Sequence, residues 1–339
     1  MFQAFGSADV LEVHDVKARS PGPREVAIRV TAAGINFFDL QIRRNEAGFP
    51  IPLPFIAGME AVGVIDEVGE GVEGWAEGDR VLRDVTDSCG KCRYCRSGQE
   101  WRCVSGALGM DSISGAFAER LVCSARRLVR VPDAIPDVEA AAVQMSYGTA
   151  WQMLHERAGL RSGDTVLISS VGSGIGAAAA DIAHAAGAFV IGTGSRDERL
   201  EVARERGTVD ATINYTSTDV TEEALRLTGG VGVDVAFEHV GGVAFDAALA
   251  SLAMDGRLVT CGWTAGPDAG LNLMDLVRQR KQVIGSVNRT LDDLHRCLAL
   301  VARGRLRPAV AATFPLEQGR TAVQLVESRS AFGKVVITP

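Results

Sequence analysis

Four cysteines that lie close together in the sequence are the clearest candidates for chemistry. Cys89, Cys92, Cys95 and Cys103 follow a C-x2-C-x2-C-x7-C pattern inside a charged segment that also contains glycine. Four thiolates at this spacing can close a tetrahedral site around Zn²⁺, and a closed four-ligand site leaves no open position for catalysis. We therefore expect one structural zinc per chain.

The same cysteines would also suit an iron–sulfur cluster or disulfides. Disulfides are disfavoured in a cytosolic protein, and a cluster would need electron-transfer partners that nothing else in the sequence implies. A cytoplasmic location is itself an expectation. The N-terminal segment MFQAFGSADVLEVHD carries acidic residues where a signal or transit peptide would avoid them.

A glycine-rich turn is the second feature with chemical meaning. Gly172, Ser173, Gly174 and Ile175 lie between the apolar segment DTVLISS and an alanine-rich helical segment. Glycines let the backbone N–H groups at a helix N-terminus approach a pyrophosphate, and the helix dipole favours its negative charge. The order of strand, turn and helix makes a dinucleotide site a better interpretation than a plain glycine turn.

The end of the next predicted strand distinguishes NAD(H) from NADP(H). Sites that prefer NAD usually carry an acidic residue there, which binds the ribose hydroxyls. This chain instead reads Gly192-Thr193-Gly194-Ser195-Arg196. No carboxylate stands there to repel a 2′-phosphate, and the Ser195 hydroxyl and Arg196 guanidinium can bind one. We therefore expect NADP(H), with a merely solvated Arg196 as the alternative.

The elements around these residues divide the chain into two kinds of structure. Up to about residue 143, short β-branched runs alternate with Gly/Pro turns, which is typical of a β-rich region. From about residue 146, strand and helix patterns alternate, which predicts a doubly wound parallel sheet and an α/β fold class. A helix near 291–302 and a strand near 334–338 break this alternation. We assign residues 1–146 and 287–339 to the first domain and 147–286 to the second.

Composition limits the class of protein and its partners. The chain has 339 residues, of which 47% are hydrophobic and 23% charged, as expected for a folded protein with two domains. No apolar run approaches the roughly 18 residues of a membrane span, so we expect no membrane partner. The net charge of -7, without a long basic block, argues against a nucleic-acid partner. Small molecules are the expected ligands.

Together these features resemble the medium-chain dehydrogenase/reductase superfamily, which includes zinc alcohol dehydrogenases and quinone or enone reductases. The resemblance runs nearly end to end. Its main motifs are AAGINFFDLQIR, AGMEAVGVIDEVGEGV, the cysteine segment, GSGIG, DVAFEHVGG and FGKVVITP. It implies a GroES-like catalytic domain with a zinc lobe at 89–103, a Rossmann domain, and pairing into a homodimer or homotetramer.

The resemblance also shows where this chain departs from the zinc alcohol dehydrogenases. Their catalytic zinc ligands correspond to Asn36, Met59 and Met145, and only Glu60 survives of the surrounding residues. An amide is a poor zinc donor, and thioethers suit softer ions such as Cu(I). The active site implied here resembles the quinone and enone reductases that lack a catalytic zinc.

Without a Lewis acid, an isolated carbonyl is difficult to reduce, whereas a conjugated double bond needs only one or two hydrogen bonds to its enolate oxygen. By the resemblance, the NH2 group of Asn36 could donate such a bond, unless it only holds a loop. Glu60 could protonate the α-carbon if burial raises its pKa, or act as a structural acceptor. The phenol of Tyr147 could donate a proton, or be a core tyrosine with a satisfied hydroxyl.

These considerations predict an NADPH-dependent reductase that transfers hydride to an enone or quinone. A small, apolar, unsaturated substrate is expected from a set of bulky apolar side chains, some of which could equally be ordinary core: Phe37, Phe38, Phe49, Phe55, Met59 and Met145. The alternatives are a zinc-independent imine or carbonyl reductase of specialised metabolism, and a non-catalytic NADP(H)-binding protein.

Overall fold

The chain folds into two compact units in a computed structural model that describes residues 1–48, 50–105, 107–108 and 115–339. The first unit contains residues 1–145, 290–304 and 308–339, and the second contains 146–289 and 305–307. Relative to the ranges expected from the sequence, Ser146 and residues 287–289 and 305–307 lie in the second unit. No helix in the described part of the chain is both long and apolar enough to cross a membrane.

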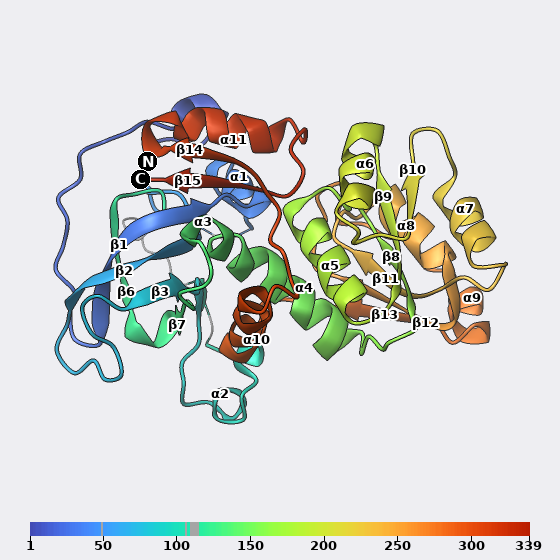
Figure 1. Cartoon of the computed structure of the whole chain (residues 1–339), viewed down its shortest axis with the longest axis horizontal. Helices are drawn as coiled ribbons and strands as arrows, with labels where there is room; N and C mark the ends of the chain where they lie inside the picture. Colours follow the sequence, from blue (N-terminus) through green and yellow to red (C-terminus); the bar gives the residue numbers. More distant parts are fainter. Residues whose placement is uncertain (49, 106, 109–114) are drawn as a thin grey trace. The chain divides into compact units, whose positions relative to one another are not determined.

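A seven-stranded sheet forms the centre of the first unit (Figure 1). Its path runs β14-β15-β1-β2-β3-β7, and β6 also pairs with β1. The strands are β1 (Glu25–Gly34), β2 (Glu60–Val68), β3 (Arg80–Arg83), β6 (Arg120–Ser124), β7 (Leu128–Arg130), β14 (Val310–Pro315) and β15 (Lys334–Thr338). Because β15 pairs antiparallel with β1, the last strand of the chain lies beside the first.

Short helices and a two-stranded ribbon complete this unit. The α-helices are α1 (Phe37–Arg43), α2 (Arg93–Arg96), α3 (Asp137–Ala140), α10 (Leu291–Ala302) and α11 (Gly319–Glu327). Single 3₁₀ turns span Ala8–Val10, Glu100–Arg102, Ala125–Arg127 and Leu316–Gln318, and the ribbon pairs β4 (Thr86–Asp87) with β5 (Ala107–Leu108). Helix α11 covers β14 and β15 and buries Ala322 and Val323 in the same apolar cluster as Val26 and Ile337 (Figure 1).

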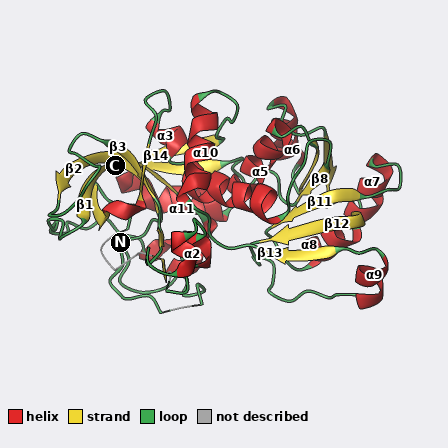
Figure 2. Cartoon of the chain, turned by 90° about the horizontal axis from the view of Figure 1, so that it is seen from below, coloured by secondary structure: helices red, strands yellow, loops and turns green. Residues whose placement is uncertain are grey.

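A six-stranded, wholly parallel sheet forms the second unit, with the order β10-β9-β8-β11-β12-β13. Figure 2 shows β8, β11, β12 and β13 of this sheet side by side. The strands are β8 (Thr165–Ile168), β9 (Phe189–Gly194), β10 (Ala211–Asn214), β11 (Val233–Glu238), β12 (Leu252–Thr260) and β13 (Gln282–Gly285). The helices are α5 (Gly174–Ala185), α6 (Asp197–Glu205), α7 (Val220–Leu227), α8 (Val243–Ala250) and α9 (Leu273–Arg278). The strand order reverses between β8 and β11, which is where open parallel sheets bind ligands.

The predicted fold class is confirmed: an antiparallel β-rich unit accompanies a Rossmann-type parallel sheet. The structure adds elements that the sequence patterns did not indicate, including α9, α11 and β14. It also contains one helical stretch with two π-helical turns, Val143–Tyr147 and Gln152–Arg157, on either side of α4 (Gly148–Trp151). Such turns are rare and frequently lie at functional sites.

Candidate active site

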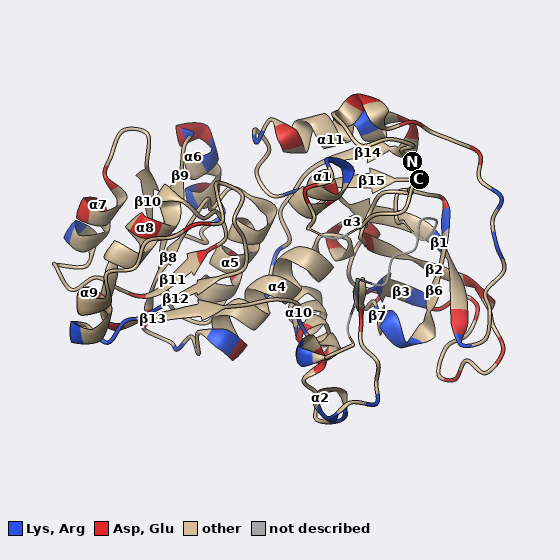
Figure 3. Cartoon of the chain, turned by 180° about the vertical axis from the view of Figure 1, so that it is seen from behind, with Lys and Arg blue, Asp and Glu red and all other residues tan. Residues whose placement is uncertain are grey.

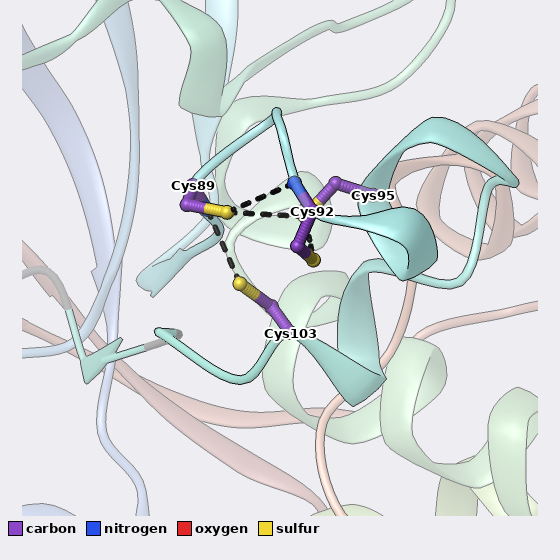
Figure 4. A group of neighbouring side chains, drawn as sticks. All are labelled: Cys89, Cys92, Cys95 and Cys103. Carbon is purple, nitrogen blue, oxygen red and sulfur yellow. Dashed lines mark hydrogen bonds between the residues drawn. The ribbon is translucent and has the colours of Figure 1, made fainter.

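The four cysteines predicted to bind zinc form one compact group (Figure 4). Their sulfur atoms all lie within 4.8 Å of one another, with 3.5 Å between the sulfurs of Cys92 and Cys95 and 4.0 Å between those of Cys89 and Cys95. Tetrahedral zinc with Zn–S bonds near 2.3 Å requires sulfurs about 3.8 Å apart. These thiols are free, and the S–S separations exceed a disulfide bond. The group therefore fits a metal ion better than a disulfide pair.

The local chain holds these sulfurs in place through its backbone. The N–H of Cys89 donates to the sulfur of Cys103 at 3.3 Å, and the N–H of Cys92 donates to the sulfur of Cys89 at 3.4 Å. The Arg126 guanidinium lies directly against Gly90, whose φ of 67° favours a residue without a Cβ. The two backbone N–H donors favour the thiolate, the form that binds metal, at Cys89 and Cys103.

A buried polar cluster joins Asn36, Glu60 and Lys334 in the first unit. The Lys334 ammonium lies 2.7 Å from Glu60 Oε2 and 2.7 Å from Asn36 Oδ1. Asn36 Nδ2 lies 3.3 Å from the same Glu60 oxygen, and the N–H of Met145 donates to Glu60 Oε1 at 3.0 Å. The side chains of Glu60 and Lys334 are 0% and 4% exposed. Sequence reasoning missed Lys334, which lies 298 residues after Asn36.

Strand ends and one glycine bring this cluster together. Glu60 begins β2, Lys334 begins β15, and Asn36 precedes the first residue of α1. A Cβ at Gly34 would stand 2.7 Å from Glu60 Oε2 and 2.3 Å from the Ala141 carbonyl oxygen. The glycine at the end of β1 therefore makes the room that the carboxylate occupies.

Both oxygens of Glu60 already have partners within the first unit. Oε1 accepts the N–H of Met145, and Oε2 accepts from the buried Lys334 ammonium. Of its two predicted roles, this arrangement favours the structural acceptor, because both oxygens are engaged inside the fold.

Asp39 is a second buried carboxyl group beside this cluster. One of its oxygens accepts the N–H of Asn36 at 2.8 Å, while Oδ1 is buried without a partner in the described structure. Burial raises the pKa of Asp39 to about 7, and the nearby Glu60 adds to the rise while Lys334 opposes it. This carboxyl is therefore poised to change charge near neutral pH.

The positions that correspond to zinc ligands in zinc alcohol dehydrogenases do not offer a ligand set. Met59 is fully buried, and Met145 packs on the same apolar cluster as Phe55 and Phe38. Within residues 1–48, 50–105, 107–108 and 115–339, the cysteine group is the one cluster of three or more His, Cys, Asp or Glu side chains arranged to hold a metal.

The apolar residues expected to line a pocket differ in burial and in packing. Phe55 and Met59 are 1% and 0% exposed, so they belong to the core rather than to a substrate-facing surface. Phe37 packs on the main apolar cluster of the first unit and lies under the guanidinium of Arg329. Phe49 lies outside the described residues.

Tyr147 is not available as a free proton donor in this structure. Its side chain is 2% exposed, and its hydroxyl donates to Asp181 Oδ2 at 2.7 Å. Asp181 also accepts the backbone N–H of Arg307 at 2.6 Å, and burial raises the pKa of this carboxyl. The arrangement is that of a core tyrosine with a satisfied hydroxyl, so we do not assign Tyr147 a chemical step.

The glycine turn of the second unit has the shape of an anion site. Ser173 caps α5 by accepting the N–H of Gly176 at 3.0 Å and donates to the Ser170 carbonyl at 2.9 Å. Gly174 and Ile175 open the helix, where N–H groups have no acceptor within the helix itself. A Cβ at Gly176 would stand 2.3 Å from the Ser170 oxygen, so the helix packs this closely only with glycine there.

His239 supports this turn from the end of β11. Its Nε2 lies 2.9 Å from the Ser169 carbonyl oxygen and 3.3 Å from the Ser173 hydroxyl. Burial lowers the pKa of His239 below its ordinary value, which favours a neutral ring. The preceding Glu238 is 0% exposed and accepts the N–H groups of Val240 and Gly241. The sequence offered no signal for this contact, because β8 and β11 become neighbours only in the folded sheet.

The end of β9 carries the residues expected to select the cofactor. Ser195 follows β9, and Arg196 is the exposed residue that precedes α6. The nearest acid, Asp197, lies in the first turn of α6 and accepts the side-chain N–H of Asn214 at 2.7 Å. Helix α6 carries both basic and acidic residues (Figure 3).

Arg199 is a further residue of this region that sequence reasoning missed. Its Nε and Nη2 atoms lie 2.7 Å from where a Cβ on Gly172 would stand. The guanidinium therefore lies against the backbone of the glycine turn. The glycine pattern alone cannot indicate this, because Arg199 reaches the turn from a different helix.

Comparisons with known proteins cover both units. A model described as an alcohol dehydrogenase GroES-like domain matches residues 22–133, and one described as a zinc-binding dehydrogenase matches 174–303. An acryloyl-coenzyme A reductase of Metallosphaera sedula is 33% identical over 330 residues, 96% of each chain. A quinone oxidoreductase of Pseudomonas aeruginosa is 31% identical over 348 residues, with 100% of this chain and 98% of the relative covered. The crystal structure of an NAD-dependent alcohol dehydrogenase matches with a TM-score of 0.94 at 36% identity, covering 100% of this chain and 98% of that one.

Proposed function

The chain belongs to the medium-chain dehydrogenase/reductase superfamily of oxidoreductases, and from this premise we propose that it reduces an activated carbon–carbon double bond with NADPH. The observation that carries the proposal is the cluster of Asn36, Glu60 and Lys334. By the resemblance, Asn36 corresponds to a metal ligand of the zinc alcohol dehydrogenases, so the cluster has an amide at that position.

The reaction class follows from what this cluster can stabilise. When bound, NADPH supplies the hydride that adds to the β-carbon of a conjugated alkene. The electrons of the double bond then move to the carbonyl oxygen, which becomes an enolate, and a proton from water adds at the α-carbon. The Asn36 NH2 group can donate to that oxygen, and one such donor commonly contributes a factor of about 100 to 1000 in kcat.

The names of the relatives agree with the reduction of a double bond conjugated with a carbonyl group. Acryloyl-coenzyme A contains a double bond conjugated with a thioester carbonyl, and a quinone contains two conjugated carbonyls. In both, negative charge develops on an oxygen that a hydrogen-bond donor can reach. We propose a small, apolar, unsaturated carbonyl compound as the substrate class.

NADPH rather than NADH is the proposed cofactor because of the residues after β9. The helix N-terminus at Gly174 suits the pyrophosphate, while Ser195 and Arg196 suit a 2′-phosphate. Arg199 brings a second guanidinium beside the glycine turn. One similar structure is named as an NAD-dependent enzyme, and titration of this protein with NADPH and with NADH tests the proposed preference.

A structural role for zinc in the cysteine lobe is part of the proposal. Cys89, Cys92, Cys95 and Cys103 would hold one Zn²⁺ with all four positions taken by sulfur. Bound there, the ion would stabilise the lobe and leave no position for a substrate oxygen.

We also propose that the chain forms a symmetric homodimer, with a dimer of dimers as the larger form. Strand β13 is at the end of the parallel sheet, with Gln282, Val283 and Gly285 exposed. The neighbouring α9 exposes Leu273 and Val277 at 67% and 72%. An exposed edge strand with apolar neighbours is a liability that pairing with a second copy removes.

A substrate panel tests the proposed function. NADPH oxidation would be followed with enones, quinones, an acryloyl thioester and cyclic imines, and NADP+ reduction would be followed with simple alcohols. We expect turnover with the conjugated carbonyl compounds and none with alcohols. Imine turnover alone would identify an imine reductase, and NADPH binding without any turnover would identify a non-catalytic binding protein; either result would reject the proposal.

A further inference from the structure

The side chain of Lys334 is buried, which is uncommon for a lysine. Lys334 begins β15, yet its side chain turns into the first unit and is 4% exposed. Its ammonium lies 2.7 Å from an oxygen of Glu60 and 2.7 Å from the amide oxygen of Asn36. Burying a lone ammonium costs several kcal/mol, so a buried lysine requires close acceptors.

The contact between Lys334 and Asn36 determines the orientation of the Asn36 amide, with Oδ1 toward the ammonium. An ammonium has three donors and no acceptor, so the amide atom beside it must be Oδ1. Nδ2 then faces the other way, 3.3 Å from both the Gly34 carbonyl oxygen and Glu60 Oε2. Both distances are longer than the usual range for an N–H···O bond, so these bonds are weak and can be exchanged.

Asn36 can act as a donor only if its amide group is held in this orientation. If the side chain of Asn36 turned over, its carbonyl oxygen would stand where its NH2 group now stands. An oxygen there would repel a developing enolate instead of stabilising it. The charge of Lys334 also withdraws electrons from the amide oxygen, which strengthens the N–H groups as donors.

We propose that Lys334 is a positioning residue, which holds the Asn36 amide with its NH2 group directed as the donor to the substrate oxygen. This inference rests on the proposed function, because it assumes that Asn36 meets the enolate. It differs from a purely structural ion pair, in which Lys334 would only neutralise Glu60.

The test must separate positioning from folding. Removing Lys334 alone leaves a buried carboxylate without its cation, which strongly destabilises a folded protein. The substitution Lys334→Met is therefore made in the background of Glu60→Gln, so that both members of the ion pair are replaced by neutral side chains. Thermal unfolding of Glu60→Gln and Glu60→Gln/Lys334→Met identifies the temperature range in which both remain folded.

Kinetics in matched backgrounds provide the first readout. In Glu60→Gln, Lys334→Met should lower kcat with an activated alkene roughly 10- to 100-fold, because a small misplacement of a catalytic donor has effects of this size. In Glu60→Gln/Asn36→Ala, the same Lys334→Met change should alter kcat less than about 2-fold, since no amide remains to be positioned. KM for NADPH should stay unchanged. Equal losses in both backgrounds, or no loss in either, would overturn the inference.

A second readout does not depend on catalysis. The side-chain NH2 resonances of Asn36 in 15N-labelled protein, assigned by their loss in Asn36→Ala, should be a single sharp pair in Glu60→Gln. They should shift, broaden or double in Glu60→Gln/Lys334→Met. Identical Asn36 resonances in the two proteins would contradict positioning. If the unmodified protein reduces no alkene while these resonances still change, the proposed function fails and the structural role of Lys334 stands.

Discussion

The guanidinium of Arg199 lies against Gly172, with two of its nitrogens 2.7 Å from the place a Cβ would take. This contact links α6 to the turn proposed to bind the cofactor pyrophosphate. Arg199→Ala should weaken binding of NADPH and NADH together, because the pyrophosphate is common to both. Gly172→Ala should have a similar effect with the guanidinium still present, since the new methyl group displaces it.

Arg196 should behave differently from Arg199. We expect Arg196→Ala to weaken NADPH binding by roughly 10-fold or more while sparing NADH, because it removes a charge-assisted contact to the 2′-phosphate. Binding is measured by titration calorimetry or by quenching of protein fluorescence. Arg204→Ala is a matched control on the same helix, where the side chain pairs with Glu201. Equal affinities for NADPH and NADH in the unmodified protein would contradict a 2′-phosphate contact at Arg196.

Asp39 should make the stability of the protein fall as the pH rises. Its folded-state pKa is raised from 3.8 to about 7, so the folded protein holds this proton more tightly than the unfolded chain. Its contribution is fully present below about pH 4 and is lost as the pH rises through about 7. Across that window it lowers the free energy of unfolding by up to about 1.4 kcal/mol per pH unit.

Urea denaturation of Asp39→Asn at several pH values tests this. The variant should gain stability relative to the unmodified protein between pH 5 and 7.5, at a slope of up to about 1.4 kcal/mol per pH unit. Lys334 and Glu60 are the charged groups that act on Asp39 most directly, and they are unchanged in the comparison. The exposed Asp268→Asn is the control. A pH-independent difference for Asp39→Asn would contradict the assignment.

One zinc per chain is expected by elemental analysis of the purified protein. Cys92→Ser should release that zinc and lower the unfolding temperature, because a structural site contributes binding energy to folding. Cys261→Ser, which changes a free thiol outside the lobe, should keep the metal. Two zinc ions per chain would contradict a vacant catalytic position, and none would contradict the zinc lobe.

The oligomeric state should depend on β13. Val283, which is 39% exposed at this edge, is the residue to change. Val283→Lys should place two like charges at a symmetric edge contact and shift the protein toward the monomer in light scattering at micromolar concentration. Val231→Lys, at a 71% exposed position in a turn of the same unit, should not. A monomeric unmodified protein would reject edge pairing outright.

Elements with local signals were predictable from the sequence. The alternation of strand and helix after residue 146 predicted β8 to β13, because each apolar run is contiguous in the chain. The spacing of the four cysteines predicted a compact group for the same reason. The helix α11 and strand β14, which both pack on β15, were missed, although α11 has a distinct apolar face.

Contacts made by the tertiary fold could not be predicted in this way. Lys334 meets Asn36 only because β15 returns beside β1, and Arg199 meets Gly172 only because α6 lies beside the glycine turn. Tyr147 was a candidate proton donor because a phenol has the right chemistry. Only the structure reveals that the Tyr147 hydroxyl donates a hydrogen bond to Asp181. Residue types indicate what chemistry is available, whereas the partners of each group decide whether it is free to act.

The reduction of an activated alkene by Asn36→Ala tests the central claim most directly. If the Asn36 amide stabilises an enolate-like transition state, kcat with the best alkene substrate should fall by roughly 100- to 1000-fold, the range associated with removing one oxyanion donor. NADPH affinity should barely change, and Asn272→Ala, which removes an asparagine that caps α9 in the other unit, should leave kcat unaltered. Full alkene reduction by Asn36→Ala, or oxidation of simple alcohols by the unmodified enzyme, would contradict the account.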